Sequence, residues 1–300
     1  MQLIVTDKQT IAEDTVSVRL EAVSGPLQAV APGAHVTLEV NGLTRRYTLT
    51  RGHNAGDPYE IQVLRARDSH GGSQWIHDDL AVGDALEGLG VANDFPLSAV
   101  PAPSVFIAGG IGITPFLSMA EAVAAAGRAF EVHHVVRSTA RQVPIPSFIL
   151  PHLTTYAGVR PDFAKLLGHV DRDSQLYVCG PVEMMAVVRA EAHRQGFASN
   201  QFHAETFGAG PAATDQPLEV HLALSGTSFV VPPGRPLLDA LLEQGAWLGY
   251  ECRRGQCGSC MAEVLEGEPI HRDSIDPALR PGAMCTCVSW ARGPRLVLNL

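Results

Sequence analysis

The sequence feature that most constrains the fold is a change in hydrophobic pattern near Ser104. Before this residue, apolar and polar residues alternate in short stretches such as Val16–Leu20, His35–Val40 and Tyr59–Leu64, with Gly, Pro and Asn between them. Alternation with a period of two is typical of strands in an antiparallel sheet that buries one face. We therefore predict a small antiparallel β-barrel over residues 1–100.

One helix is expected to interrupt this barrel at Ser73–Leu80. The pair Gly71–Gly72 precedes it and suits a tight turn, and Ser73 is a residue type that often caps helices. Because the first N–H groups of a helix also bind phosphate, the turn is either a simple helix cap or a phosphate site.

After Ser104 the pattern becomes buried strand, glycine-rich turn and alanine-rich helix, and a second such unit starts at Gln175. This order is typical of a parallel sheet with helices on its faces. We predict an α/β domain over 101–209, a Gly/Ala/Pro-rich linker over 210–217 and a third domain over 218–300.

Composition argues against several classes of function. The formal net charge of -9 disfavours nucleic acid as a partner. The sequence contains no run of eighteen apolar residues, so no membrane span is expected. The first twenty residues do not resemble a secretion signal. Cysteines cluster between Cys252 and Cys287, which favours a metal site over disulfides and a reducing, cytoplasmic location.

The clustered cysteines have a specific spacing. Cys252, Cys257 and Cys260 form C-x4-C-x2-C, and Cys285 and Cys287 follow. This is the spacing of plant-type [2Fe-2S] ferredoxins, in which one loop supplies three thiolates and a distant residue supplies the fourth. A zinc site and a set of buried free thiols are the alternatives, although zinc loops usually pair two C-x2-C knuckles.

Small residues within the loop support the cluster. Gly255, Gly258 and Ser259 are expected to bring backbone N–H groups close to the sulfur atoms, which stabilises their negative charge.

Two loops of the α/β segment are candidates for nucleotide binding. The stretch Gly109–Pro115 reads GGIGITP and joins a buried strand to a helix, so its N–H groups and the helix dipole could hold a pyrophosphate. It departs from G-x-G-x-x-G, and a glycine turn that only permits tight packing is the alternative. Cys179–Pro181 ends another strand at the same sheet edge, where ligands of open α/β folds bind.

A third candidate site lies in the barrel segment. Within Arg45–Thr48, Arg and Thr could bind phosphate and Tyr47 could lie against a flat aromatic ring. An exposed strand with ordinary polar residues is the alternative.

Taken together, these motifs make the chain resemble the phthalate dioxygenase reductase family, which includes the reductases of vanillate O-demethylase type systems. The resemblance covers essentially the whole chain. It implies an FMN-binding barrel, an NAD-binding domain and a C-terminal [2Fe-2S] ferredoxin domain of the α+β, β-grasp type.

The resemblance also implies roles for matching residues. FMN would be held by Arg45, Tyr47, Thr48, Gly71, Gly72 and Ser73. The nucleotide would be held by Gly110, Gly112, Thr114, Pro115, Gly180 and Pro181. The catalytic positions would be Cys179, near the nicotinamide, and Phe207, which ends an E-x-F motif begun by Glu205 and whose ring lies by the flavin.

The implied cluster ligands are Cys252, Cys257, Cys260 and Cys287. The CVS string at Cys287 resembles the fourth-cysteine context of the family and favours Cys287 over Cys285.

The chain departs from the family pattern in two places. Residues Val91–Leu97 read VANDFPL, which lacks the arginine that the family often has there, and Thr48 replaces the more usual serine while keeping the hydroxyl.

The implied function is transfer of electrons from NADH through FMN and a [2Fe-2S] cluster to a Rieske-type oxygenase, with the chain acting as a monomer. A flavin is needed because a nicotinamide gives two electrons as hydride, whereas the cluster accepts one. The sequence shows neither a two-His, one-carboxylate iron site nor a Rieske motif, so the substrate belongs to a partner.

Three other functions stay open at this point: a reductase for a cytochrome P450, a free-flavin reductase and a zinc-binding module. NADH is preferred to NADPH by resemblance alone, because Arg137 and Arg141 could favour a 2'-phosphate.

Overall fold

The chain folds as two units, Met1–Ala204 and Glu205–Leu300, in the computed structural model. The structure describes residues 1–52, 54–66, 71–207, 210–212 and 214–300. Among these residues, no helix is both long and apolar enough to cross a membrane.

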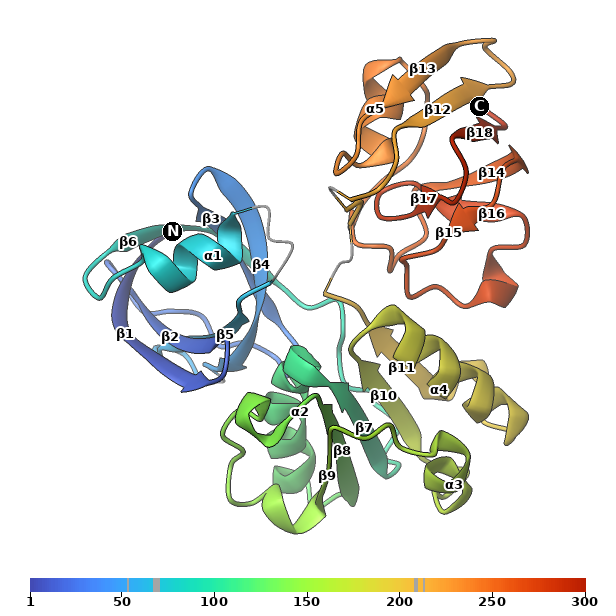
Figure 1. Ribbon diagram of the computed structural model, residues 1–300. Coiled ribbons are helices and arrows are strands. Elements are labelled where there is room, and N and C mark those ends of the chain that lie inside the picture. Colours follow the sequence, from blue (N-terminus) through green and yellow to red (C-terminus); the bar gives the residue numbers. More distant parts are fainter. Residues whose placement is uncertain (53, 67–70, 208–209, 213) are drawn as a thin grey trace. The chain divides into compact units, whose positions relative to one another are not determined.

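The predicted barrel is present in the first unit, where six antiparallel strands close on themselves (Figure 1). Their order is β1-β2-β5-β4-β3-β6, and β1 pairs with β6 to close the ring, with Leu3 opposite Leu86. The strands are β1 (Gln2–Ala12), β2 (Thr15–Ala22), β3 (His35–Val40), β4 (Leu43–Arg51), β5 (Tyr59–Leu64) and β6 (Ala85–Ala92).

The barrel interior is filled by every second side chain of its strands. Val18, Leu20, Leu38 and Ile61 are fully buried and belong to one apolar cluster. Successive side chains of a strand point to opposite faces, so the alternation seen in the sequence becomes an inside and an outside. The barrel is therefore a packed core rather than a channel.

The predicted helix of the barrel begins earlier than expected. Helix α1 spans Gly72–Asp78, and its N-cap is Gly71, which makes no side-chain cap. The expectation that Ser73 caps this helix is wrong, because Gly71 adopts φ +102° and turns the chain two residues sooner. Ser73 instead accepts a hydrogen bond from the Ala66 N–H at 3.2 Å.

The first unit also contains the predicted parallel sheet, with strand order β11-β10-β7-β8-β9. Its strands are β7 (Ser104–Gly109), β8 (Phe130–Val136), β9 (Leu153–Ala157), β10 (Gln175–Cys179) and β11 (Phe202–Glu205). Its helices are α2 (Thr114–Ala125), α3 (Phe163–Gly168) and α4 (Val182–Arg194). Separate apolar clusters include residues of α2 and residues of α3 with α4, so helices cover both faces (Figure 1).

The strand order of this sheet contains a switch in direction. The chain runs outward from β7 to β8 and β9, then returns to place β10 on the other side of β7. In open α/β sheets, the loops that leave the carboxyl ends of strands at such a switch point flank a ligand crevice. Here these are the loops after Gly109 and Cys179, the two loops predicted for nucleotide binding.

The second unit is built on a mixed sheet of order β13-β12-β18-β14-β16. Its strands are β12 (Leu218–Leu222), β13 (Ser228–Val231), β14 (Met261–Glu266), β16 (Ala283–Cys285) and β18 (Arg295–Leu298). A small pair, β15 (Pro269–Ile270) with β17 (Trp290–Ala291), and helix α5 (Leu237–Glu243) complete it. The last strand, β18, runs parallel to β12 and antiparallel to β14 in the middle of the sheet.

The predicted linker over 210–217 is only partly described, because residue 213 lies outside the described part of the chain. Near its end, the Asp215 carboxylate binds the Arg272 guanidinium through two contacts of 2.6 and 2.7 Å. The Trp290 indole N–H donates to the Gln216 carbonyl at 3.1 Å. Asp215 and Gln216 are therefore held to the second unit, and the predicted domain limits stay a prediction.

The filled barrel core predicts that replacing a buried leucine lowers the free energy of unfolding far more than replacing an exposed one. Leu38→Ala should lower the free energy of unfolding by about 3 kcal/mol, because it opens a cavity in a filled interior. Leu89→Ala on β6 should change it by less than about 0.5 kcal/mol, since Leu89 is 49% exposed whereas Leu38 is fully buried. Urea unfolding followed by circular dichroism measures both, and equal losses would contradict a filled barrel.

Candidate functional site

The residues predicted to bind the FMN phosphate lie on β4 and at the start of α1. A Cβ atom built on Gly72 would lie 2.9 Å from the Arg45 Nε, so the arginine side chain passes directly over the turn. A larger residue at this position would displace the arginine side chain. The structure therefore brings a guanidinium together with the N–H groups of a helix start, which are the donors that a phosphate needs.

Tyr47 and Thr48 lie on opposite faces of β4. Arg45, Tyr47 and Leu49 share one face because side chains alternate along a strand, and Thr48 points to the other. Tyr47 packs against the barrel core, and burial raises its pKa to about 12. Tyr47 is thus a neutral, partly buried ring beside Arg45, whereas Thr48 is buried on the opposite face.

The two loops predicted for nucleotide binding are interlocked. A Cβ atom on Gly112 would lie 2.2 Å from the Cys179 carbonyl oxygen, and one on Gly109 would lie 2.6 Å from the Pro181 Cδ. Gly180 approaches Gly109 equally closely, with 2.9 Å between its ideal Cβ and the Gly109 Cα. The backbones of the two loops touch at the switch point. Both loops therefore need glycine, because a side chain would not fit between them.

Thr114 and Pro115 begin helix α2 directly after this loop. Pro115 stands in the first turn, where a missing N–H costs nothing. The Thr114 hydroxyl donates to the Ile111 carbonyl at 3.0 Å and is buried. Thr114 therefore shapes the loop through its own hydrogen bond.

One contact of the nucleotide loop was not expected from the sequence. His133 and His134 both lie in β8. The His134 Nε2, however, lies 2.9 Å from the Gly110 carbonyl oxygen. No local sequence signal marks this contact, because it joins strand β8 to the turn that follows β7, which lies 24 residues earlier in the chain.

Arg141 does not fit the 2'-phosphate hypothesis. Its guanidinium lies 3.0 Å from the Glu13 carboxylate and 2.5 Å from that of Asp14, at the turn between β1 and β2. The Glu13 N–H also donates to the Ala140 carbonyl at 2.8 Å. Arg141 therefore joins the barrel to the parallel sheet, and Arg137, which is exposed, is the remaining candidate of the two.

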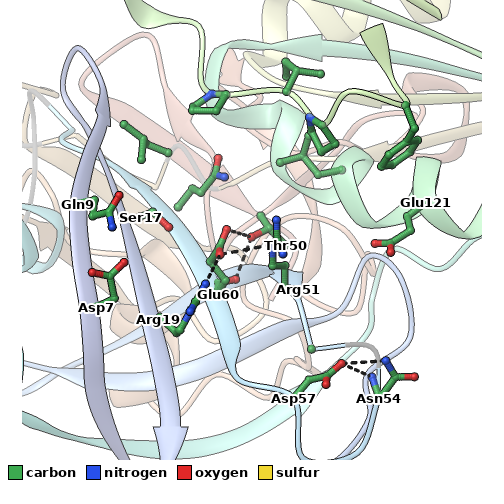
Figure 2. Close-up of a pocket in the computed structure, with 18 residues that line it drawn as sticks. Asp7, Gln9, Ser17, Arg19, Thr50, Arg51, Asn54, Asp57, Glu60 and Glu121 are labelled. Atoms are coloured by element: carbon green, nitrogen blue, oxygen red, sulfur yellow. Dashed lines mark hydrogen bonds and ion pairs between the residues drawn. The ribbon is translucent and has the colours of Figure 1, made fainter. Parts of the chain in front are cut away.

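A cavity of about 540 Å³ opens between the barrel and the α/β part of the first unit. Figure 2 shows its barrel wall, where Arg19, Arg51 and Thr50 surround Glu60. Leu117 and Glu121 of α2 and the segment 144–148 line the opposite wall. The lining contains none of the predicted cofactor residues, so this cavity is distinct from the predicted FMN and nucleotide positions.

In the second unit, hydrogen-bond donors surround the thiols of the cysteine loop. The N–H groups of Arg254 and Cys257 both lie 3.4 Å from the Cys252 sulfur, and the Ser259 hydroxyl lies 3.1 Å from the Cys257 sulfur. Donors to sulfur were expected from Gly255, Gly258 and Ser259. The structure adds Arg254 and Cys257 to this set.

Gly255 and Gly258 have a further role, because both adopt a positive φ, +68° and +75°. A Cβ atom on Gly255 would lie 2.6 Å from the Val288 Cγ2 and 2.7 Å from the Asp273 Cβ. Asp273 is fully buried and binds Arg280 at 3.1 Å. The loop thus folds directly over a buried ion pair.

The later cysteines meet the loop in an apolar cluster. Cys260, Cys285 and Cys287 pack with Leu238 and Val288, whereas Cys257 is exposed. Hydrogen bonds from the thiols of Cys285 and Cys287 lower the pKa of Cys260 to about 3, and the same bonds raise the pKa of both partners.

The two candidates for the fourth ligand have different neighbours. Cys287 lies near both Cys260 and Cys252 and accepts a hydrogen bond from the Gly255 N–H. Cys285 lies near Cys260, Cys287 and the Asp273 carboxylate. Of the two candidates, only Cys287 therefore lies near both Cys252 and Cys260, the first and last thiols of the loop.

This donor set fits a dinuclear cluster. Among the described residues, no three His, Cys, Asp or Glu side chains are gathered closely enough to hold one metal ion. A [2Fe-2S] cluster spreads four thiolates over two irons, so it does not need such tight convergence.

Comparison with known proteins identifies the family of this chain. A family model described as "2Fe-2S iron-sulfur cluster binding domain" matches residues 220–292. The chain is 34% identical over 316 residues to "Vanillate O-demethylase oxidoreductase" of Pseudomonas sp. (strain HR199 / DSM 7063), with 100% of each chain covered. The chain belongs to the phthalate dioxygenase reductase family.

A solved structure of phthalate dioxygenase reductase, described as modular and as transferring electrons from pyridine nucleotides to [2Fe-2S], has a TM-score of 0.75 and 32% identity. It covers 100% of this chain and 98% of that one. An intact type IV self-sufficient cytochrome P450 monooxygenase has a TM-score of 0.69 and 31% identity, and this chain spans 41% of its length.

Membership of the phthalate dioxygenase reductase family makes the chain an oxidoreductase and the reductase component of an oxygenase system. Its cofactors are NADH, FMN and a [2Fe-2S] cluster. The predicted family, fold class, activity and cofactors are confirmed, and the zinc-binding module is excluded as a function.

The tight contact at Gly255 predicts a selective loss of iron. Gly255→Ala should abolish most cluster loading, because the new Cβ would strike Val288 and Asp273. Gly226→Ala is the matched control: its φ is +69°, but nothing lies within 4 Å of an added Cβ. The control should lose about 1–2 kcal/mol of stability yet bind iron normally. Equal iron content in both purified proteins would contradict the close packing described for the loop.

Proposed function

We propose that this reductase moves electrons from NADH by way of FMN and the [2Fe-2S] cluster to a Rieske-type oxygenase. The observation that supports this order is the division of donor groups between the two units. The Arg45 turn and the interlocked glycine loops lie in Met1–Ala204, and the clustered thiols lie in Glu205–Leu300. Each unit thus has the donors for one kind of redox group.

In the first unit, the chain's own task is to bind and orient. Arg45 and the N–H groups at Gly72 and Ser73 would hold the FMN phosphate, with Tyr47 and Thr48 as further contacts. When bound, FMN accepts a hydride and returns its electrons singly, which a one-electron cluster requires. The high pKa of Tyr47 keeps its hydroxyl protonated, so it can donate a hydrogen bond at any physiological pH.

Gly110 and Gly112, with Thr114 and Pro115, would present backbone N–H groups to the pyrophosphate of NADH. Gly180 and Pro181 would close the other side of the same crevice. Cys179, buried at the end of β10, would lie near the nicotinamide.

We assign Phe207 as the ring beside the flavin on the basis of its E-x-F motif. Phe207 is 44% exposed.

The cluster ligands in this proposal are Cys252, Cys257, Cys260 and Cys287. Burial of Cys260 and Cys287 among apolar side chains excludes water, and the N–H donors near Cys252 stabilise thiolate charge. Cys257 is the exposed ligand of the set. Electrons would therefore leave the cluster toward an external acceptor on the side of Cys257.

We further propose that the acceptor is a separate Rieske-type oxygenase, that the reductase is a monomer and that it is cytoplasmic. The curated relative named for vanillate O-demethylase supports an oxygenase partner, and the clustered thiols suit a reducing compartment.

Serine replacements test the ligand set. Cys252→Ser, Cys257→Ser, Cys260→Ser and Cys287→Ser should each lose the normal visible spectrum and most bound iron. Cys285→Ser should keep both, and so should Cys179→Ser, a buried thiol of the first unit. A normal spectrum in Cys287→Ser together with its loss in Cys285→Ser would reverse the fourth ligand.

Truncation of the chain tests the direction of electron flow. Removing residues from Gly210 onward should leave NADH-driven flavin reduction nearly intact, because the barrel and parallel sheet have their own cores. Delivery of electrons to the oxygenase should fall to background, measured with free flavin scavenged. Oxygenase turnover at the intact rate would place the cluster off the main path, and would favour a free-flavin reductase.

A reductase for a cytochrome P450 is the second candidate, favoured by the likeness to a self-sufficient P450 monooxygenase. Reduction of purified Rieske oxygenases and P450s by the same preparation separates the two functions, because the true acceptor should be reduced at the faster rate.

A further inference from the structure

His134 is buried where the nucleotide loop leaves the sheet. Its side chain is fully buried, and it stands on β8 in register with Ala108 of the neighbouring strand β7. It shares a face of β8 with Val132, which packs in the apolar cluster that also contains residues of α2. The ring therefore lies beneath the point where β7 turns into the loop at Gly110.

The hydrogen bond of His134 has only one possible direction. Its Nε2 lies 2.9 Å from the Gly110 carbonyl oxygen, and a carbonyl only accepts, so Nε2 must hold a proton and donate. The Nδ1 atom is buried without a hydrogen-bond partner among the described residues. Burial lowers the pKa of His134, so the ring is neutral, with its single proton on Nε2.

This bond fixes the orientation of one peptide group in the loop. Gly110 has φ +56°, a left-handed conformation in which glycine has wide freedom, so backbone geometry alone does not hold its carbonyl in place. In a trans peptide the following N–H, that of Ile111, points opposite to the carbonyl. A carbonyl held toward His134 on β8 therefore turns the Ile111 N–H in the opposite direction.

We propose that His134 is a positioning residue for the nucleotide site: its Nε2–H holds the Gly110 carbonyl so that the loop presents its N–H groups to the pyrophosphate of NADH. This inference rests on the proposed role of the Gly110–Pro115 loop. It does not make His134 a catalytic residue, because its fully buried ring acts through the Gly110 peptide group.

The test compares three variants of the full-length holoenzyme. His134→Phe keeps a ring but removes the donor, and His134→Gln keeps an N–H donor at the position of Nε2. His133→Phe is the matched control: it is the same change one residue earlier, on the opposite face of β8, where His133 contacts the Tyr156 hydroxyl at 3.2 Å. The probe is ADP-ribose, which contains the pyrophosphate but no nicotinamide, and calorimetry gives its dissociation constant.

His134→Phe should weaken ADP-ribose binding by about tenfold, the effect expected from losing one buried hydrogen bond of about 1.4 kcal/mol. Its KM for NADH should rise similarly, whereas flavin reduction at saturating NADH should stay close to that of the parent. His134→Gln should bind nearly as well as the parent, and so should His133→Phe. A merely structural role would not give this separation of KM from kcat or the rescue by Gln.

Unchanged affinity in His134→Phe would overturn the inference, and so would equal weakening in His133→Phe. If His134→Phe does not fold, His134→Gln and His134→Leu replace it, and equal affinities in these two also overturn it. Gly110→Ala tests the underlying loop assignment separately. If this change leaves ADP-ribose affinity intact, the loop is not the pyrophosphate site; if it alone weakens binding, the loop assignment stands and the role of His134 fails.

Discussion

Backbone contact between two glycine loops is the constraint on which the nucleotide side of the molecule depends. Gly112 leaves no room for a Cβ against the Cys179 carbonyl, and Gly109 leaves none against Pro181. The loops leave adjacent parallel strands at the switch point, which is where open α/β sheets bind their ligands. The sheet order sets the two loops side by side, and the close packing at their glycines fixes these few backbone atoms in position.

Much of the architecture could be predicted from residue patterns. The alternation in Tyr59–Leu64 and His35–Val40 corresponds to strands β5 and β3 of the barrel, because period-two burial is a local property. The strand starting at Gln175 ends at Cys179 as expected. The cysteine spacing predicted the cluster for the same reason: three of its thiols come from one loop, and a loop is contiguous in sequence.

What sequence could not supply depends on distant or finely balanced geometry. Ser73 was expected to cap α1, but a left-handed glycine before it fixed the start of the helix. Arg141 was considered for nucleotide recognition, although it pairs with carboxylates more than 120 residues away. The role of His134 depends on strand pairing, which residue periodicity does not specify. The predicted FMN residues also divide between two faces of β4, which their adjacency in the sequence conceals.

The central position of strand β18 has a consequence for how the second unit folds. This strand comprises Arg295–Leu298 and lies between β12 (Leu218–Leu222) and β14 (Met261–Glu266) in its sheet. The sheet can therefore close only when segments far apart in the sequence find each other, and such non-local pairing slows folding.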